Sequence, residues 1–188
     1  MSEIAVTVET TMPEERIPIF HRLYEEAFGP LRAKAIARQV LHPEEFREEM
    51  VDPRVRKYVA HADGEPIGVT TLTRHLETVP WISPDYFAAR YPEHAARDAI
   101  YYAGFTLVAP SARQGAAFHA MIKSVVQALV AERAAVGWDI CSYNNTRFSF
   151  ADSIRAVLDE QANVEVAVED SQIYYAARFI GDGATKGG

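Results

Sequence analysis

The apolar residues between positions 118 and 130 recur at every third or fourth position, which places them along one face of an α-helix. An apolar, aromatic-rich run at residues 99–108 predicts a strand that enters this helix through a short turn of small residues. Because the first N–H groups of a helix have no partner within it and carry the positive end of its dipole, such a turn favours a bound anion. The pattern therefore predicts a site for a phosphorylated ligand. The helical face consists of Phe118, Met121, Ile122, Val125, Val126, Leu129 and Val130.

The same patterning divides the rest of the chain into short strands and helices. Asp63-Gly64 is a strong hairpin signal between two strand-like runs, and Ser149 is expected to cap the last helix. Residues 77–98 are irregular but rich in aromatic side chains, so they are expected to pack. We predict strands at residues 4–8, 55–62, 67–76, 99–108, 138–143, 164–168 and 173–179. We predict helices at residues 17–28, 31–41, 44–50, 118–130 and 150–161, which together define a mixed α/β domain.

Size and composition fit one globular domain, because the chain has 188 residues, 48% of them hydrophobic and 24% charged. We assign residues 1–180 to this domain and expect residues 181–188 to be a disordered tail. No run approaches the roughly 20 apolar residues that span a membrane, and the start lacks the pattern of a secretory signal. With a single cysteine, Cys141, these features predict a cytoplasmic protein without disulfides.

The formal net charge of −7 argues against a broad nucleic-acid surface, because phosphate contacts need clustered Lys and Arg. The six histidines show no i, i+4 pairing and have no cysteine nearby, so no metal site is expected. Any phosphate binding is therefore expected at a small local site.

Two segments resemble the GNAT superfamily of acyltransferases. DGEPIGVTTL (63–72) is similar to the hairpin that precedes the cofactor strand in that family. LVAPSARQGAAFHAMI (107–122) resembles its pyrophosphate-binding strand–loop–helix. The predicted strand at 138–143, which ends at Asn144, and the order of the elements extend the resemblance over most of the chain. The resemblance implies an α/β (α+β) fold with a mixed, mostly antiparallel central sheet flanked by helices.

The resemblance also implies transfer of an acetyl or longer acyl group from acetyl-CoA, or another acyl-CoA, to a small-molecule amine. The backbone of Leu107 and Val108 would contact pantetheine, with the Val108 N–H near the thioester oxygen. Small side chains in the following loop would let a phosphate approach the backbone closely. On the local sequence alone, the same loop also fits a tight strand-to-helix turn. The residues that would hold the pyrophosphate are Arg113, Gln114, Gly115, Ala116 and Ala117.

Three further residues are candidates for substrate contact or proton transfer. Asn144 either contacts pantetheine or substrate, or serves as a turn residue. Tyr143 would replace the tyrosine that protonates the leaving thiolate in this family, because residues 149–161 contain none; the alternative is a packing role. Asp98, like Glu77, flanks a cofactor strand without a carboxylate of its own, and is either the base or a solvated surface group. The phosphate loop is also one residue shorter than the family pattern.

Two alternatives remain open at this point. The missing proton-transfer groups also fit a non-catalytic GNAT-like module that binds an acyl thioester. The aromatic insertion at 77–98 faintly resembles N-acyl amino acid and acyl-homoserine lactone synthases, which implies a longer acyl chain and an acyl carrier protein as donor. Because carrier proteins are acidic, docking would need a basic patch around Arg90, Arg97 or Arg113. A homodimer is also compatible with the sequence.

Overall fold

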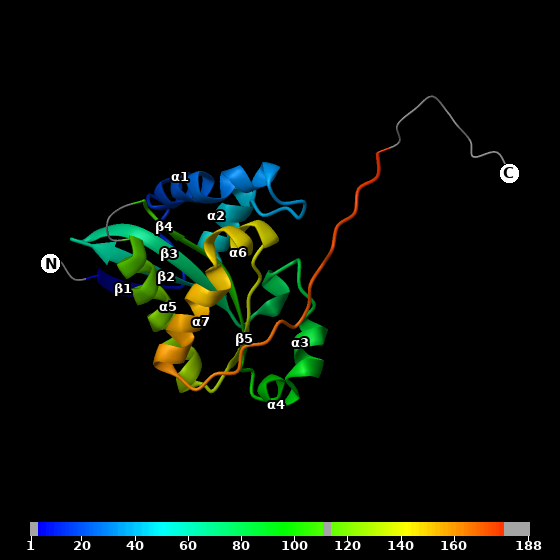
Figure 1. Ribbon diagram of the computed structural model, residues 1–188. Coiled ribbons are helices and arrows are strands. Elements are labelled where there is room, and N and C mark those ends of the chain that lie inside the picture. Colours follow the sequence, from blue (N-terminus) through cyan, green and yellow to red (C-terminus); the bar gives the residue numbers. More distant parts are fainter. Residues whose placement is uncertain (1–3, 111–113, 179–188) are drawn as a thin grey trace, which may run out of the picture.

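A five-stranded sheet forms the centre of the computed structural model, which describes residues 4–110 and 114–178 (Figure 1). Neighbouring strands from β1 to β4 are antiparallel, and β5 runs parallel to β4, so the predicted mixed, mostly antiparallel sheet is confirmed. The strands are β1 (Ile4–Glu9), β2 (Val55–Ala62), β3 (Glu65–Thr73), β4 (Ile100–Val108) and β5 (Ala135–Gly137). The helices are α1 (Ile17–Phe28), α2 (Pro43–Val51), α3 (Pro84–Arg90), α4 (Pro92–Ala95), α5 (Gln114–Ala131), α6 (Ser142–Phe148) and α7 (Phe150–Gln161). Two 3₁₀ helices, η1 (Gly29–Ala33) and η2 (Leu76–Thr78), complete the described elements.

Helices cover both faces of the sheet (Figure 1). On one face, α1 and α2 pack through the fully buried Phe20 and Phe46 against Val69 of β3. On the other face, α5 packs through Met121 and Val125, and α7 lies against α5. Burying a side chain of this size contributes about 1.5–3 kcal/mol, so these two layers hold the sheet in place. The predicted helical face is confirmed for Met121, Val125, Val126 and Leu129, whereas Val130 is exposed.

The hairpin between β2 and β3 turns at Asp63 and Gly64, as the sequence predicts. Both residues have positive φ, 53° for Asp63 and 85° for Gly64. Two successive positive φ angles match the right-handed twist of the flanking strands, and Gly adopts them without steric cost.

The aromatic segment between β3 and β4 folds into η2, α3 and α4 against one end of the sheet. Leu76 and Val79 are buried together with Tyr102 of β4. Phe87 of α3 meets Tyr102 edge-on, with 6.2 Å between ring centroids. The expectation that this segment packs is therefore confirmed.

Two predicted elements in the middle of the chain are wrong. Residues 31–41 form no α-helix: η1 ends at Ala33, and the buried Leu31 and Val40 are not joined by a continuous apolar helical face. The strand predicted at 138–143 is also absent, since β5 ends at Gly137 and the chain then leaves the sheet for α6. Phe87 packs so closely on Gly137 that an added Cβ would lie 2.6 Å from its ring.

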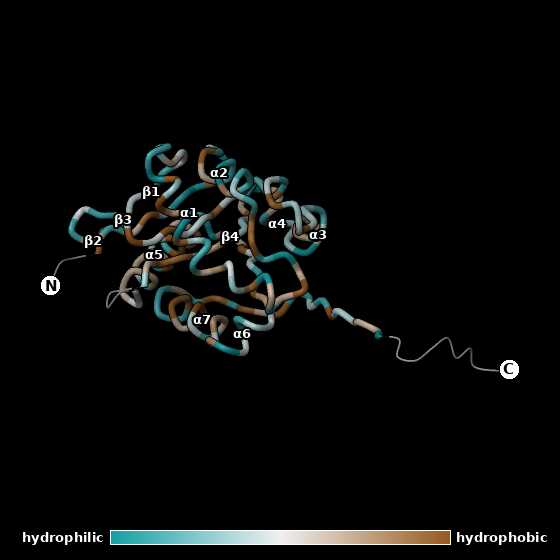
Figure 2. The backbone as a smooth tube through the Cα atoms, turned by 90° about the horizontal axis from the view of Figure 1, so that it is seen from above, coloured by the Kyte–Doolittle hydropathy of each residue, from teal (hydrophilic) through white to brown (hydrophobic). Residues whose placement is uncertain are grey.

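The predicted C-terminal strands at 164–168 and 173–179 are absent from the described residues, which end at 178. Glu169 still pairs with Arg90 of α3, and the chain beyond it leaves the body of the molecule in both views (Figures 1 and 2). The neighbouring edge strand β5 is only three residues long and offers few backbone groups for pairing. Ser149 is the N-cap residue of α7, as predicted, but it has positive φ and its side chain makes no capping hydrogen bond. The predicted tail at 181–188 lies outside the described residues.

Candidate active site

A wedge opens between β4 and β5. The two strands pair at only three positions, from Ile100 opposite Ala135 to Tyr102 opposite Gly137. Beyond Tyr102, β4 continues to Val108, whereas the chain after Gly137 turns away from it. The edge of β4 that faces this gap therefore has no β5 residue beside it after position 102.

A bulge lies where the wedge begins. The pairing of β3 with β4 shifts from Thr70 opposite Thr106 to Leu72 opposite Ala103. Gly104 and Phe105 therefore stand opposite Thr71 alone. Such a bulge increases the local twist and redirects the side chains that follow it. The redirection explains why Ala103 packs on the α5 side of the sheet, while Phe105 packs with α1 and α2.

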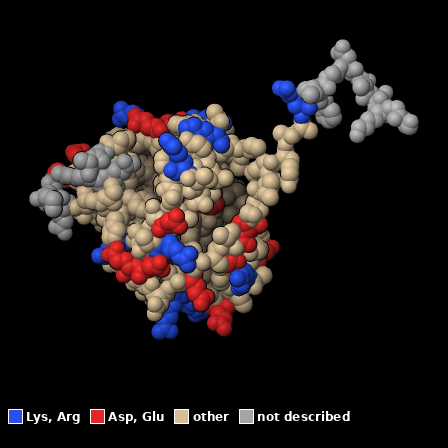
Figure 3. Space-filling view, viewed as in Figure 1, with Lys and Arg blue, Asp and Glu red and all other residues tan. Residues whose placement is uncertain are grey.

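A cavity of about 140 Å³ lies in the wedge and continues between α5 and α7. Its floor includes the β4 backbone from 103 to 106, and the cavity is largely apolar toward the helices. Figure 3 shows a hollow in this face of the molecule beside α6, with acidic and basic side chains intermixed around it. Helical residues lining the cavity include Phe118, Ile122, Asn144, Phe150, Ile154 and Leu158.

The last residues of β4 aim a backbone donor into this wedge. The Ala109 N–H donates to the Ile67 carbonyl oxygen of the β3 segment at 2.7 Å. Because successive N–H groups of a strand point to opposite edges, the Val108 N–H points away from β3, toward the gap. The Leu107 side chain is buried in the α1–α2 core, so only its backbone is available to the wedge.

α5 begins at Gln114, shortly after the end of β4, and its first N–H groups lack helical partners. A Cβ added at Gly115 would meet nothing within 4 Å among the described residues, so space is open beside this position. Ala116 is exposed and Ala117 is fully buried against the sheet. Arg113 lies outside the described residues, as does the side chain of Gln114.

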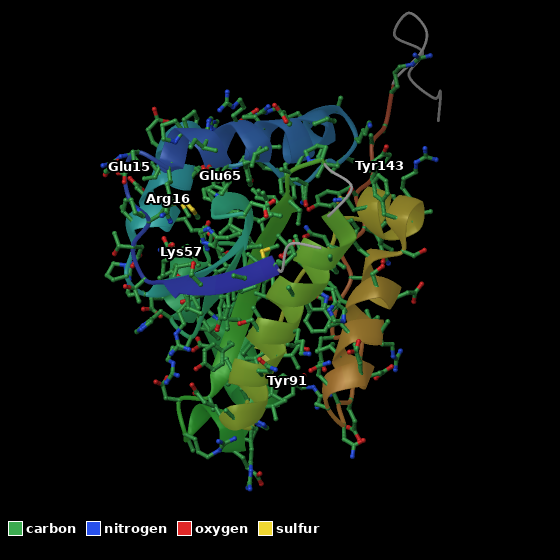
Figure 4. The ribbon with its side chains drawn as sticks, turned by 90° about the vertical axis from the view of Figure 1, so that its left-hand side faces the viewer. Glu15, Arg16, Lys57, Glu65, Tyr91 and Tyr143 are labelled. Carbon is green, nitrogen blue, oxygen red and sulfur yellow. The ribbon has the colours of Figure 1, made fainter. Side chains whose placement is uncertain are left out.

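The structure brings one of the three other candidates to the cavity. Asn144 lines it from α6 rather than from the end of a strand. Tyr143, on the same helix (Figure 4), accepts a hydrogen bond from Lys34 Nζ at 3.0 Å. Its side chain does not line the cavity. Asp98 lies before the opposite end of β4, 78% exposed, with Arg74 at 3.5 Å. Ten residues of extended chain separate it from Val108, about 30 Å.

A carboxylate that the sequence does not single out lies on the other side of the bulge. Glu49 of α2 lines a smaller cavity of about 20 Å³, together with Thr71 and Gly104. Its Oε1 accepts a hydrogen bond from Thr71 Oγ1 at 2.9 Å. Burial raises the pKa of Glu49, while the Thr71 hydrogen bond and the charge of Lys57 act in the opposite direction. No pattern in the sequence points to Glu49, because it is close to β4 only in the folded structure and not along the chain.

Asp139 connects the two cavities. Its Oδ1 accepts a hydrogen bond from Trp81 Nε1 at 3.2 Å and another from the Tyr102 hydroxyl. Tyr102 and Trp81 line the smaller cavity, and Asp139 lines the larger one. Burial, with the neighbouring Asp139 carboxylate, raises the pKa of Tyr102, so its hydroxyl is a poor proton donor.

Two of the three basic residues expected to dock a carrier protein have partners within the chain, and the third, Arg113, lies outside the described residues. Arg90 pairs with Glu169 at 2.8 Å, and Arg97 donates to the carbonyl oxygens of Glu132 and Arg133. Among the described residues, no group of three His, Cys, Asp or Glu side chains is arranged to hold a metal ion. Within the same part of the chain, no helix has the length and apolar content needed to cross a membrane.

This architecture is the fold of the GNAT N-acetyltransferases. Aminoglycoside N-acetyltransferase AAC(6')-Iy in complex with CoA matches with a TM-score of 0.54 at 16% identity, over 95% of this chain and 97% of that chain. AAC(6')-Ib in complex with CoA and kanamycin gives 0.53 at 15% identity, over 82% and 83%. The ribosomal-protein-alanine N-acetyltransferase of Brucella melitensis biovar Abortus 2308 gives 0.51 at 13%, over 94% and 99%. No protein-family model matches the chain, and no curated protein matches its sequence.

Proposed function

We propose that the protein transfers an acyl group from an acyl-CoA to a primary amine. The single observation that carries this proposal is the wedge between β4 and β5, with the start of α5 just beyond the end of β4, in a fold shared with acetyltransferases that bind CoA. Binding and orienting two substrates removes much of the entropic barrier to such a reaction. Acetyl-CoA is the first donor to test, and the apolar cavity also suits a longer acyl chain.

In this proposal the wedge holds pantetheine along the free edge of β4. The Val108 N–H points into the gap and donates to pantetheine. The thioester lies farther back along this edge, toward the bulge at Gly104, where free β4 N–H groups stabilise the negative charge that develops on its oxygen. The open start of α5, with Arg113, Gln114, Gly115, Ala116 and Ala117, holds the pyrophosphate. Asn144 contacts pantetheine or the acceptor from the opposite wall of the cavity.

The acceptor is proposed to be a small amine. AAC(6')-Ib is described with kanamycin, an aminoglycoside, and the ribosomal-protein acetyltransferase has an alanine acceptor by its name. We therefore propose aminoglycosides, polyamines and peptides with an N-terminal alanine as the panel of acceptors. Because Arg90 and Arg97 already have partners, free acyl-CoA is preferred over a carrier protein as donor.

Isothermal titration calorimetry with acetyl-CoA tests the binding half of the proposal. Gly115→Glu is expected to weaken binding about tenfold relative to Gly115→Gln, equivalent to about 1.4 kcal/mol. Both side chains have open space at this position, and a carboxylate in the first helical turn does not harm the helix. The Glu and Gln variants therefore differ in charge, and the negative charge of the Glu side chain repels the pyrophosphate.

Equal affinities of the two variants would place the pyrophosphate elsewhere. Absence of acetyl-CoA binding to the unmodified protein would refute the proposed function itself. Binding without transfer to any amine of the panel would identify an acyl-thioester-binding module instead.

A further inference from the structure

The direction of the Glu49 side chain is set by α2. The helix begins with a capping box, in which the His42 N–H donates to Glu45 Oε2 at 2.7 Å. Phe46 and Met50 of the same helix are fully buried against the sheet. Since residues three apart share a helix face, Glu49 lies on the same side as Phe46 and faces the sheet.

Glu49 meets the sheet at the bulge of β4. Thr71, the β3 residue opposite the bulge, donates its hydroxyl to Glu49 Oε1 at 2.9 Å. A Cβ built on Gly104 would overlap Thr71 Oγ1 and would lie 3.4 Å from Glu49 Oε1, so a glycine leaves room for this contact. Gly104 lines both cavities. The carboxylate is therefore adjacent to the wedge in which the thioester is proposed to lie.

The surroundings of Glu49 suit a carboxylate that binds a cation and accepts a proton from it. Burial raises its pKa, and Asp52 adds to this effect, while Lys57 opposes it. The phenol of Tyr24 is the other titratable group that the carboxylate influences. A raised carboxyl pKa brings the group closer to the working pH at which a general base is most effective. Trp81 and Tyr102 line the same cavity, and aromatic side chains favour a cation.

We propose that Glu49 is the catalytic residue that binds the acceptor as an ammonium ion and removes its proton. This inference rests on the proposed function. The ammonium donates one proton to Glu49, which becomes a neutral carboxylic acid, and the freed nitrogen lone pair forms a bond to the thioester carbon. The C=O bond pair moves to oxygen, then returns as the C–S bond breaks. The departing thiolate takes the second nitrogen proton, which yields an amide, free CoA thiol and protonated Glu49.

The other carboxylates near the wedge are less suited to this role. Asp139 Oδ1 already accepts hydrogen bonds from Trp81 and Tyr102. Asp98 lies at the far end of β4 beside Arg74. Among the described residues, the hydrogen-bond partner of Glu49 is Thr71, which occupies Oε1 and leaves Oε2 for a substrate. Because one amine proton passes to Glu49 and the other to the departing thiolate, the reaction needs no tyrosine on α7 as a proton donor.

The test compares Glu49→Gln with Glu48→Gln, a matched control at an exposed position of the same helix. Acetyl-CoA affinity is measured by calorimetry, and thiol release is followed from pH 6 to 10 with the best acceptor of the amine panel. Glu49→Gln keeps an oxygen for Thr71 and is expected to fold and to bind acetyl-CoA normally. Its kcat/KM is expected to fall about 100-fold at pH 7, as for loss of a general base. The deficit is expected to shrink toward pH 10, where the free amine needs no base.

A second variant, Glu49→Asp, keeps a carboxyl group on a shorter side chain. Its kcat is expected to be lower, but its kcat/KM is expected to fall at low pH as in the unmodified protein. Unchanged kcat/KM in Glu49→Gln at pH 7 would overturn the inference while leaving the transferase intact. A loss by the same factor at every pH would also overturn it, because that pattern indicates a structural role. If the unmodified protein binds acetyl-CoA but acylates no amine, the proposed function fails and this inference fails with it.

Discussion

Lys57 is fully buried, and its ammonium group donates to the carbonyl oxygens of Thr10 at 2.9 Å and Asp52 at 2.7 Å. Burial lowers its pKa to about 8, although the nearby carboxylates of Glu49, Asp52 and Glu9 act in the opposite direction. A buried charge of this kind is tolerated because its donors are satisfied by hydrogen bonds. Figure 4 shows Lys57 well separated from Tyr143 of α6.

The lowered pKa of Lys57 predicts a pH-dependent stability. In the unfolded chain its pKa returns to about 10.5, so between pH 8 and 10.5 the unfolded state binds the proton that the folded state has lost. The free energy of unfolding is therefore expected to rise with pH across this window. In Lys57→Met the rise should be absent. Urea denaturation at pH 7.5, 8.5 and 9.5 measures both proteins.

Lys123→Met is the control, because Lys123 is exposed on α5 and its removal should leave the pH slope of the unmodified protein. If Lys57→Met shows the same slope as this control, the buried lysine is not the group that titrates.

At the scale of elements, β3, β4 and α5 meet closely at Gly68. A Cβ at this position would lie 2.9 Å from the Leu107 carbonyl oxygen and 3.1 Å from Met121 Cε. The backbone oxygen cannot move without disturbing the β3–β4 pairing, and it belongs to the strand that forms the floor of the wedge. Glycine at 68 therefore sets how closely β3, β4 and α5 approach one another.

Gly68→Ala is expected to destabilise the fold by about 1–3 kcal/mol, as overpacking of a close contact does. Gly29→Ala is a matched control, since the nearest atoms to its added Cβ are flexible side-chain ends at 3.4 Å. Chemical denaturation of both variants compares the two costs. An equal, small effect at both sites would show that the β3–α5 contact relaxes freely.

Elements with strong local signals could be predicted from the sequence. The Asp63-Gly64 turn sets the β2–β3 hairpin through its own backbone, and α5 follows from a long 3.6-residue period. β5 ends at Gly137, which lies against the Phe87 ring, a contact between distant segments that no local pattern encodes. Asn144 was therefore expected at a strand end but lies on α6.

The candidate site also has one part that local sequence can predict and another that depends on contacts between distant segments. The turn proposed to bind phosphate is continuous in the sequence, so it can be proposed from the sequence alone. Glu49 of α2 lies 51 positions before Ile100, the first residue of β4, and only folding places it beside Gly104. The bulge that admits it also depends on pairing with Thr71.

For the whole molecule, the two faces of the sheet have different tasks in this account. The α5 and α7 side of the wedge receives acyl-CoA, and the α2 side supplies the carboxylate for the amine. β4 separates the two sides and donates from its free edge to the thioester. Since the net charge of the chain is −7, attraction of the anionic donor must come from local donors, whereas a cationic acceptor suits the overall field.

The most direct test of this account is mass spectrometry of the amine panel after incubation with isotopically labelled acetyl-CoA and the unmodified protein. The account predicts one labelled acetyl group on a primary amine, formed in step with CoA thiol release and strongly reduced by Gly115→Glu. Acetyl-CoA binding that leaves every amine unlabelled would contradict it.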